Sequence, residues 1–82
     1  MRLDKYLKVS RLIKRRTIAK EATSNEYVYV NGKPQKPGYK LKLKDIIKIK
    51  FAVKIIEVEV TSLFPQKDEL MYKIIKEERV AT

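Results

Sequence analysis

The sequence predicts an α+β domain in which two N-terminal helices pack on a small, mostly antiparallel sheet, followed by a short C-terminal helix. Three observations predict this fold. Apolar residues recur at helical spacing before residue 25, they alternate with polar residues up to residue 60, and they form a second helical stripe after Pro65. A length of 82 residues suits one small domain with a modest core.

The first 24 residues contain two short amphipathic segments. Leu3, Tyr6 and Leu7 stand at i, i+3 and i+4, which is one face of a helix, and a turn is expected near residues 10–13. A second helix is predicted over residues 15–24. The residues expected to point inward from it are Ile18, Ala19 and Ala22, and those expected to point outward are Arg15, Arg16 and Lys20.

The middle of the chain predicts strands. A β-branched and aromatic run at residues 27–30 ends in Asn-Gly at residues 31–32, the strongest short turn signal in the sequence. Apolar residues then occupy odd positions over residues 39–55 and even positions over residues 56–60. A slip of one residue reverses the faces of a strand, so we expect a bulge or tight turn near residues 54–56 and a sheet of three to five strands.

A final helix is predicted from about Lys67 to Arg79. Its apolar stripe consists of Leu70, Met71, Ile74 and Ile75. We expect this stripe to pack against the sheet, and docking of a partner protein is the alternative. The chain then divides into residues 1–62 as the main domain and residues 63–82 as a helical tail.

The net charge of +10 is concentrated near the N-terminus. Residues 2–20 carry eight basic side chains and one acidic, residues 21–50 carry seven and three, and residues 51–82 carry five and six. Such asymmetry is typical of a binding face for nucleic acid rather than of general solubility. Some lysines alternate with apolar residues on the expected strands and are interpreted as merely solvated: Lys40, Lys42, Lys48 and Lys50.

The composition argues against an enzyme and against a metal site. The chain has no cysteine and no histidine, so thiol nucleophiles, the commonest general base and the commonest zinc ligand are missing. Two glycines cannot form a glycine-rich phosphate loop. We therefore expect no catalysis and no cofactor. Because no apolar run is long enough to span a bilayer, we expect a cytoplasmic protein with no membrane partner. We also expect a monomer.

The remaining feature is an electropositive face on the two predicted helices. Arginines on such a face can bind phosphates through two hydrogen bonds, and lysines add attraction that does not depend on base sequence. Most aromatic residues occupy core-like positions, and Tyr39 is the one candidate for stacking on a base. The face therefore predicts recognition of structured RNA by its backbone and shape rather than of single-stranded bases.

Three motifs in this region resemble the S4 RNA-binding domain family. They are Arg2-Leu3-Asp4-Lys5-Tyr6-Leu7, Lys14-Arg15-Arg16-Thr17-Ile18-Ala19 and Tyr29-Val30-Asn31-Gly32-Lys33. They match the first helix, the second helix and the following hairpin of that family without a gap. Together with the turn at Asp45, the resemblance covers roughly residues 1–50 and implies the S4 (alpha-L) RNA-binding fold.

The length and the opening stretch also resemble the RqcP family of free-standing S4 proteins of ribosome-associated quality control (RQC), relatives of the heat-shock S4 protein. This resemblance implies binding to the rRNA of obstructed large ribosomal subunits and to the peptidyl-tRNA in the P site. It further implies cooperation with the elongation factor RqcH while C-terminal alanine tails are added, with no bond made by this chain.

The resemblance implies that Arg2 and Arg16 are the main RNA contacts. With the other basic residues of the helical face and with the neighbouring hairpin, the candidate RNA-binding residues are Arg2, Lys5, Lys8, Arg11, Lys14, Arg15, Arg16, Lys20, Asn31 and Lys33. Asp4 matches the aspartate in the first helix of the family. We expect it to cap the helix or to pair with a neighbouring basic group rather than to contact RNA.

Two positions depart from the family pattern. Where the family has glycine after the second helix, this chain has Asn25-Glu26, and either residue could adopt the positive φ that a helix end favours. Where the family has Pro-Gly before the turn aspartate, this chain has Leu43-Lys44. We expect both departures to alter loop geometry and to leave the basic face unchanged.

Two other functions stay open at this point. The heat-shock branch of the domain recycles free large subunits that carry nascent chains, and it usually has a longer basic C-terminal extension than the near-neutral tail found here. The other is an adaptor of a different class, which would dock a partner protein through Met71 and Ile75 of the predicted tail helix.

Overall fold

The computed structural model describes residues 1–65 and 69–79, and this part of the chain forms two helices and five strands. The helices and strands are α1 (Leu3–Val9), α2 (Arg16–Ser24), β1 (Val28–Val30), β2 (Lys33–Pro34), β3 (Ile46–Lys50), β4 (Lys54–Val60) and β5 (Tyr72–Arg79). Neither helix in this part of the chain is long and apolar enough to cross a membrane.

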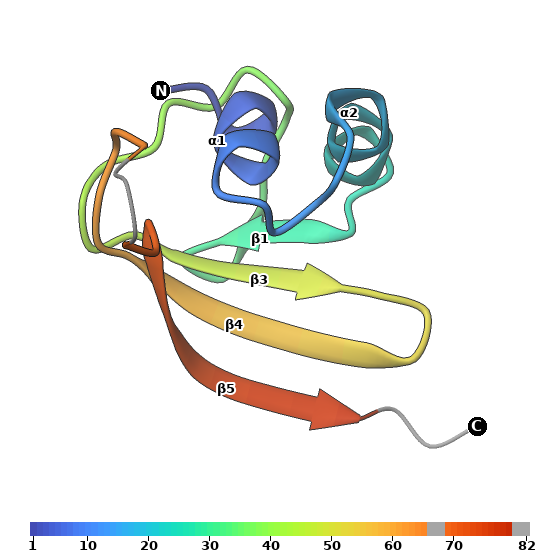
Figure 1. Ribbon diagram of the computed structural model, residues 1–82. Helices are drawn as coiled ribbons and strands as arrows, with labels where there is room; N and C mark the ends of the chain where they lie inside the picture. Colours follow the sequence, from blue (N-terminus) through green and yellow to red (C-terminus); the bar gives the residue numbers. More distant parts are fainter. Residues whose placement is uncertain (66–68, 80–82) are drawn as a thin grey trace.

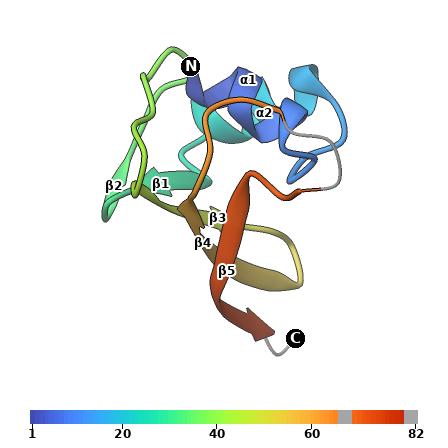
Figure 2. The same cartoon turned by 60° about the vertical axis from the view of Figure 1, so that its left-hand side comes forward.

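The strands form one antiparallel sheet in the order β2-β1-β3-β4-β5. Both helices lie over the β1 end of this sheet, while β4 and β5 extend away from them (Figure 1). The segment that follows β4 runs beside α1 before the chain returns as β5 (Figure 2). The predicted α+β fold, with two N-terminal helices on a small antiparallel sheet, is confirmed.

The hydrophobic core lies between the helices and the central strands. Leu3, Tyr6 and Leu7 of α1 are fully buried, as their spacing predicted. Ala19 brings α2 into the same core. The sheet contributes two rows of apolar cross-strand neighbours, Val30–Ile47–Val58 and Val28–Ile49–Ile56.

The inward face of α2 differs from the prediction. Ile18 was expected to point inward and is 48% exposed, whereas Ala19 and Thr23 are buried. Ala19 and Thr23 are four residues apart and therefore share one face of the helix. The buried face of α2 therefore consists of small side chains, and Ile18 lies beside it, half exposed.

The Asn-Gly hairpin between β1 and β2 is confirmed. Asn31 and Gly32 have φ values of 53° and 86°, as a two-residue turn of type I′ requires. The Asn31 side chain also joins this turn to the start of β3. Its Nδ2 donates to Asp45 Oδ1 at 3.1 Å, and its Oδ1 accepts from the backbone N–H of Ile46 at 2.9 Å.

The change of phase predicted near residues 54–56 comes from a tight turn at residues 51–53. There the backbone N–H of Phe51 donates to the carbonyl of Lys54 at 2.8 Å. Across the resulting hairpin Ile49 stands opposite Ile56, so odd positions of β3 and even positions of β4 share the core face.

Residues 39–43 do not form a strand of the sheet, although their apolar residues alternate. This loop pairs instead with the N-terminus, through a single bridge between Lys40 and Arg2. Of the alternating residues, Leu41 is buried whereas Leu43 is 55% exposed, so the alternation does not correspond to a continuous buried face.

The predicted helix from Lys67 to Arg79 is wrong: residues 72–79 form β5, and residues 67 and 68 lie outside the described residues. In β5, Lys76 pairs with Glu57 and Ile74 pairs with Val58, so a register shift leaves Ile75 as one extra residue in the strand. The two adjacent isoleucines at this irregularity account for part of the predicted helical stripe. Pairing with β5 satisfies the backbone hydrogen-bonding groups on the outer edge of β4, which a helix would leave unpaired.

The segment before β5 is tied directly to α1. The hydroxyl of Tyr6 donates to the carbonyl of Met71 at 2.6 Å, and Met71 itself is 3% exposed. Burial raises the pKa of the Tyr6 phenol well above its usual value, and the nearby Tyr72 adds to the shift. The docking helix of the adaptor alternative is therefore wrong, because residues 72–79 form a strand, and Met71 is buried in the core, whereas Ile75 is half exposed.

Both departures from the family pattern fall on residues with positive φ. After α2, Asn25 keeps a φ of −94° and Glu26 takes 62°; before Asp45, Lys44 takes 72°. This left-handed region is unfavourable for residues other than glycine. The backbone conformation that glycine favours is thus present at both positions, although the residues here are Glu26 and Lys44.

Candidate nucleic-acid interface

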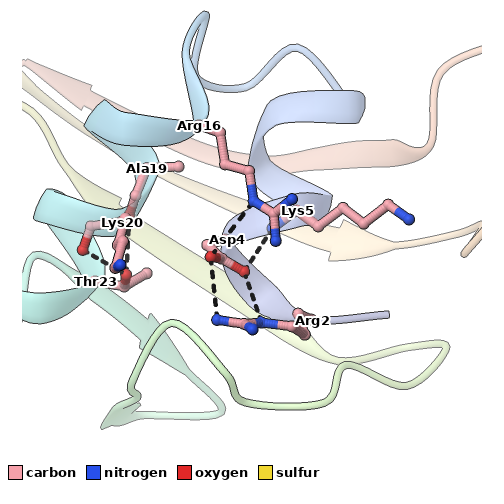
Figure 3. A network of polar contacts seen from close by, with 7 residues as sticks. All are labelled: Arg2, Asp4, Lys5, Arg16, Ala19, Lys20 and Thr23. Carbon is pink, nitrogen blue, oxygen red and sulfur yellow. Dashed lines mark hydrogen bonds and ion pairs between the residues drawn. The ribbon is translucent and has the colours of Figure 1, made fainter.

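A buried carboxylate lies at the centre of the basic face. Asp4 stands in the first turn of α1 and is 1% exposed. Its Oδ1 accepts hydrogen bonds from the backbone N–H of Lys5 at 2.9 Å and from Arg2 Nε at 3.2 Å, while Oδ2 accepts from Arg2 Nη2 at 3.3 Å (Figure 3). The carboxylate therefore binds one guanidinium group with both of its oxygens.

Arg16, the first residue of α2, completes this cluster from the other helix. Its Nε lies 3.7 Å from Asp4 Oδ2, and the side chains of Arg2 and Arg16 are still about half exposed. One negative charge thus orients two positive charges, and the exposed edges of both guanidinium groups can donate to a phosphate. The prediction that Asp4 pairs with neighbouring basic groups is confirmed.

The loop at residues 37–41 holds the N-terminus in position for this cluster. The backbone N–H of Leu3 donates to the carbonyl of Tyr39 at 2.7 Å, and that of Asp4 donates to the carbonyl of Pro37 at 3.1 Å. Gly38 lies beside the Arg2 guanidinium, since a Cβ atom at this glycine would be 4.0 Å from Arg2 Nη2. The loop therefore fixes the backbone from which Arg2 extends.

Six of the candidate residues line two clefts that border the segment after β4. The first cleft has a volume of about 540 Å³ and is lined by Met1, Arg2, Lys5, Arg16, Leu63 and Phe64. The second has about 530 Å³ and is lined by Lys8, Val9, Arg11, Lys14 and Pro65. Each cleft thus combines three cations with a few apolar side chains.

The other four candidates lie outside these clefts. Arg15 and Lys20 are exposed at the start and in the middle of α2, and Lys33 is exposed on β2. Asn31 is exposed, but its side-chain amide is engaged with Asp45 and Ile46. Their contact with RNA stays a prediction.

Sequence reasoning overlooked the apolar part of the first cleft. Tyr39, the predicted stacking residue, packs partly buried against the core. Phe64 is 74% exposed and lies beside three cations. The available signal was an aromatic residue just before Pro65, four residues after the strand pattern ends at Val60.

Comparisons with known proteins identify the family of the chain. The S4 domain family matches residues 1–47. The RQC P-site tRNA stabilizing factor of Listeria monocytogenes is 51% identical over 96% of this chain and 90% of its own length. Those of Bacillus subtilis and Streptococcus pneumoniae are 44% and 46% identical over 98% of this chain, and 98% and 96% of their own lengths.

A solved structure supports the fold independently. The trimeric structure of Vibrio cholerae Heat Shock Protein 15 superimposes with a TM-score of 0.82 at 21% identity, over 92% of this chain and 81% of that one. The match concerns the fold alone. From the sequence matches, the chain belongs to the S4 domain family and, within it, to the RQC P-site tRNA stabilizing factors.

Proposed function

We propose that the chain is a non-catalytic RNA-binding factor of ribosome-associated quality control, which binds obstructed large ribosomal subunits and stabilises the P-site tRNA. The observation that carries this proposal is the cluster of Arg2 and Arg16 around the buried Asp4. The relatives are RQC P-site tRNA stabilizing factors, and their function supplies the biological setting of the proposal.

The cluster acts by preorganisation. A free arginine side chain loses conformational freedom when it binds a phosphate, at a cost of about 0.5–1.5 kcal/mol. Asp4 removes part of this cost because it already holds both guanidinium groups in place. The charge of the cluster remains positive, so phosphates are still attracted.

Two separate cationic clefts suit two stretches of nucleic-acid backbone. In the proposed role, one stretch belongs to rRNA of the large subunit and the other to the peptidyl-tRNA. Binding both at once holds the tRNA relative to the subunit without any covalent step. The chain does this while RqcH directs the addition of C-terminal alanine, and it acts in the cytoplasm, where these subunits are found.

The proposal is tested by the variant Arg16→Ala. We expect it to abolish co-sedimentation with obstructed large subunits and to leave thermal unfolding nearly unchanged, because the side chain is half exposed. Lys73→Ala is the matched control, since it removes the same charge from an exposed position on β5 outside both clefts. Equal loss of binding in both variants, or loss of the fold in Arg16→Ala, would contradict the proposal.

The proposed cooperation with RqcH in alanine tailing is tested by affinity purification of the chain, with analysis of both the RNA and the protein that copurify. Recovery of P-site tRNA together with RqcH supports the role in alanine tailing. Recovery of free large subunits carrying nascent chains, without RqcH, supports the heat-shock type of recycling instead. If all partners stay attached after RNase treatment, binding is through protein, and the RNA-binding proposal fails.

A further inference from the structure

We propose that Phe64 forms a stacking site for one unpaired nucleobase of the bound RNA, beside the Arg2–Asp4–Arg16 cluster. This inference rests on the proposed function and deepens it, because it adds base recognition to a face expected to bind only backbone and shape. The ligand is a nucleotide whose phosphate is held by the cations of the first cleft and whose base lies against the phenyl ring.

The phenyl ring of Phe64 is 74% exposed. Single exposed apolar side chains are common on protein surfaces, so exposure alone carries little information. The surroundings of this ring are more specific. It shares a cleft of about 540 Å³ with Arg2, Lys5 and Arg16, and the cleft is otherwise lined by the apolar side chains of Met1 and Leu63.

These surroundings match the two parts of a nucleotide. Among the described residues, the cleft is lined by three cations and by no acidic side chain, which suits a phosphate. An aromatic ring with apolar neighbours suits a flat base. The volume also falls within the range of about 300–1,000 Å³ that is typical of pockets for small organic groups. A fully paired duplex offers its phosphates but no free base face, so an unpaired nucleotide is the better match.

The segment that carries Phe64 is held in place by hydrogen bonds. The carbonyl of Met71 accepts from the backbone N–H groups of Thr61 and Ser62, at 3.0 and 3.1 Å, and from the hydroxyl of Tyr6 at 2.6 Å. Ser62 Oγ donates to the carbonyl of Phe64 at 2.8 Å and accepts from its N–H at 3.1 Å. The backbone of Phe64 is thus anchored to α1, the helix that carries Lys5 and Asp4.

A second groove, of about 330 Å³, is also lined by Phe64 and has a different character. Its other lining residues are Leu43, Leu63, Leu70 and polar side chains, and Glu69 is the one charged residue among the described residues that line it. A carboxylate repels phosphate, so this groove does not suit a nucleotide. The charge of the first cleft is what favours RNA over an apolar protein segment as the partner of Phe64.

Phe64 also lies outside the part of the chain that the S4 domain family matches, residues 1–47. The arginine cluster comes from within that part, and the aromatic ring is brought to it by the segment after β4. The proposed base site is therefore an addition made by the later part of the chain to the basic face of the domain.

The test uses two RNA hairpins of the same sequence, one fully paired and one with a single unpaired 2-aminopurine in its stem. The fluorescence of 2-aminopurine falls when the base stacks on an aromatic ring. We expect the wild-type chain to quench it and to prefer the hairpin with the unpaired base. Phe64→Ala should weaken binding of that hairpin by about 5- to 150-fold, abolish the quenching, and leave binding of the paired hairpin unchanged.

Three further variants make the test specific. Phe64→Trp should keep the preference, whereas Phe64→Leu, which is apolar but not aromatic, should lose it; Leu70→Ala, exposed in the other groove, should behave as wild type. Wild-type binding by Phe64→Leu, or an equal change for both hairpins in Phe64→Ala, would overturn the proposal. Loss of a copurifying protein with unchanged RNA affinity would overturn it in favour of protein docking.

Arg16→Ala separates this inference from the proposed function. It should weaken binding of both hairpins, because it removes a phosphate contact. If Arg16→Ala weakens both and Phe64→Ala weakens neither, the stacking site is refuted and the RNA-binding function stands. If Arg16→Ala weakens neither, the proposed function itself fails.

Discussion

At the scale of single residues, the proposed binding face is organised around an acidic side chain. The N-terminal region is strongly basic, yet its two main arginines are oriented by Asp4, which is buried and accepts hydrogen bonds from Arg2 and Lys5. A negative charge in a site for a polyanion lowers the total attraction. In the proposed site this loss is offset, because two guanidinium groups held in place bind a phosphate at a lower entropic cost.

This argument predicts the outcome of Asp4→Asn. The net charge rises by one, so electrostatics alone would strengthen RNA binding. We expect the opposite, a loss of about 5- to 150-fold in affinity, because both arginines lose their shared partner. Glu21→Gln is the matched control: it makes the same change of charge at an exposed position on α2, and its affinity should stay equal or rise slightly. Tighter binding by both variants would show that Asp4 has no orienting role.

At the scale of secondary structure elements, the contact between α1 and the segment before β5 joins the basic face to the far end of the sheet. Its centre is the hydrogen bond from the Tyr6 hydroxyl to the Met71 carbonyl at 2.6 Å. The same carbonyl accepts the backbone N–H groups of Thr61 and Ser62. One buried acceptor thus connects the first helix, the segment after β4 and the approach to β5.

The raised pKa of Tyr6 makes this contact sensitive to alkaline pH. The folded state favours the neutral phenol, so its contribution to stability is complete below the unfolded value of 10.0 and declines as pH rises above it. We expect Tyr6→Phe to lower the free energy of unfolding by about 1 kcal/mol at neutral pH. The difference from wild type should shrink above pH 10, as measured by urea unfolding across a pH series.

Tyr27→Phe serves as the control for this series, because it removes the hydroxyl of a tyrosine that is 52% exposed. Its unfolding free energy should follow that of the wild-type chain at every pH. A constant difference between wild type and Tyr6→Phe from neutral to strongly alkaline pH would contradict the assignment of the decline to Tyr6.

At the scale of the whole molecule, the surplus of positive charge is separated from the charge-balanced later strands, along the chain and in space. The first fifty residues carry a net charge of +11 and the rest of the chain carries −1. Six of their basic residues line the two clefts beside α1, α2 and the segment after β4. The later strands carry nearly balanced charge, such as the Lys54–Glu77 and Lys76–Glu78 pairs.

This separation predicts the salt dependence of RNA binding. If all six cleft cations neutralise phosphates, the logarithm of the association constant should fall with the logarithm of salt concentration with a slope of roughly −4 to −5. Lys14→Ala, in the second cleft, should make the slope less negative by about 1. Lys73→Ala should leave the slope unchanged. A slope near zero would show that phosphates contribute little to binding.

The sequence alone predicted what depends on short-range patterns. The spacing of Leu3, Tyr6 and Leu7 encodes a buried helical face, and the Asn-Gly pair encodes a tight turn, because in each case the residues that interact are near neighbours in the chain. The crowding of cations before residue 21 likewise predicted a basic helical face, and six of these cations line the two clefts. These features together were sufficient for the fold class and the S4 resemblance.

Only the tertiary structure decided what depends on contacts between distant segments. Ile74 and Ile75, together with Leu70 and Met71, have helical spacing as a local pattern. This segment nevertheless forms a strand, because it pairs with the edge of β4 through a shift of register. In the same way, Asp4 pairs with Arg16, and Phe64 comes to line one cleft with both arginines, only after the helices and the segment after β4 have packed together. Local sequence patterns do not predict these long-range contacts, because the position of each residue in a pair depends on how its own segment packs against the rest of the chain.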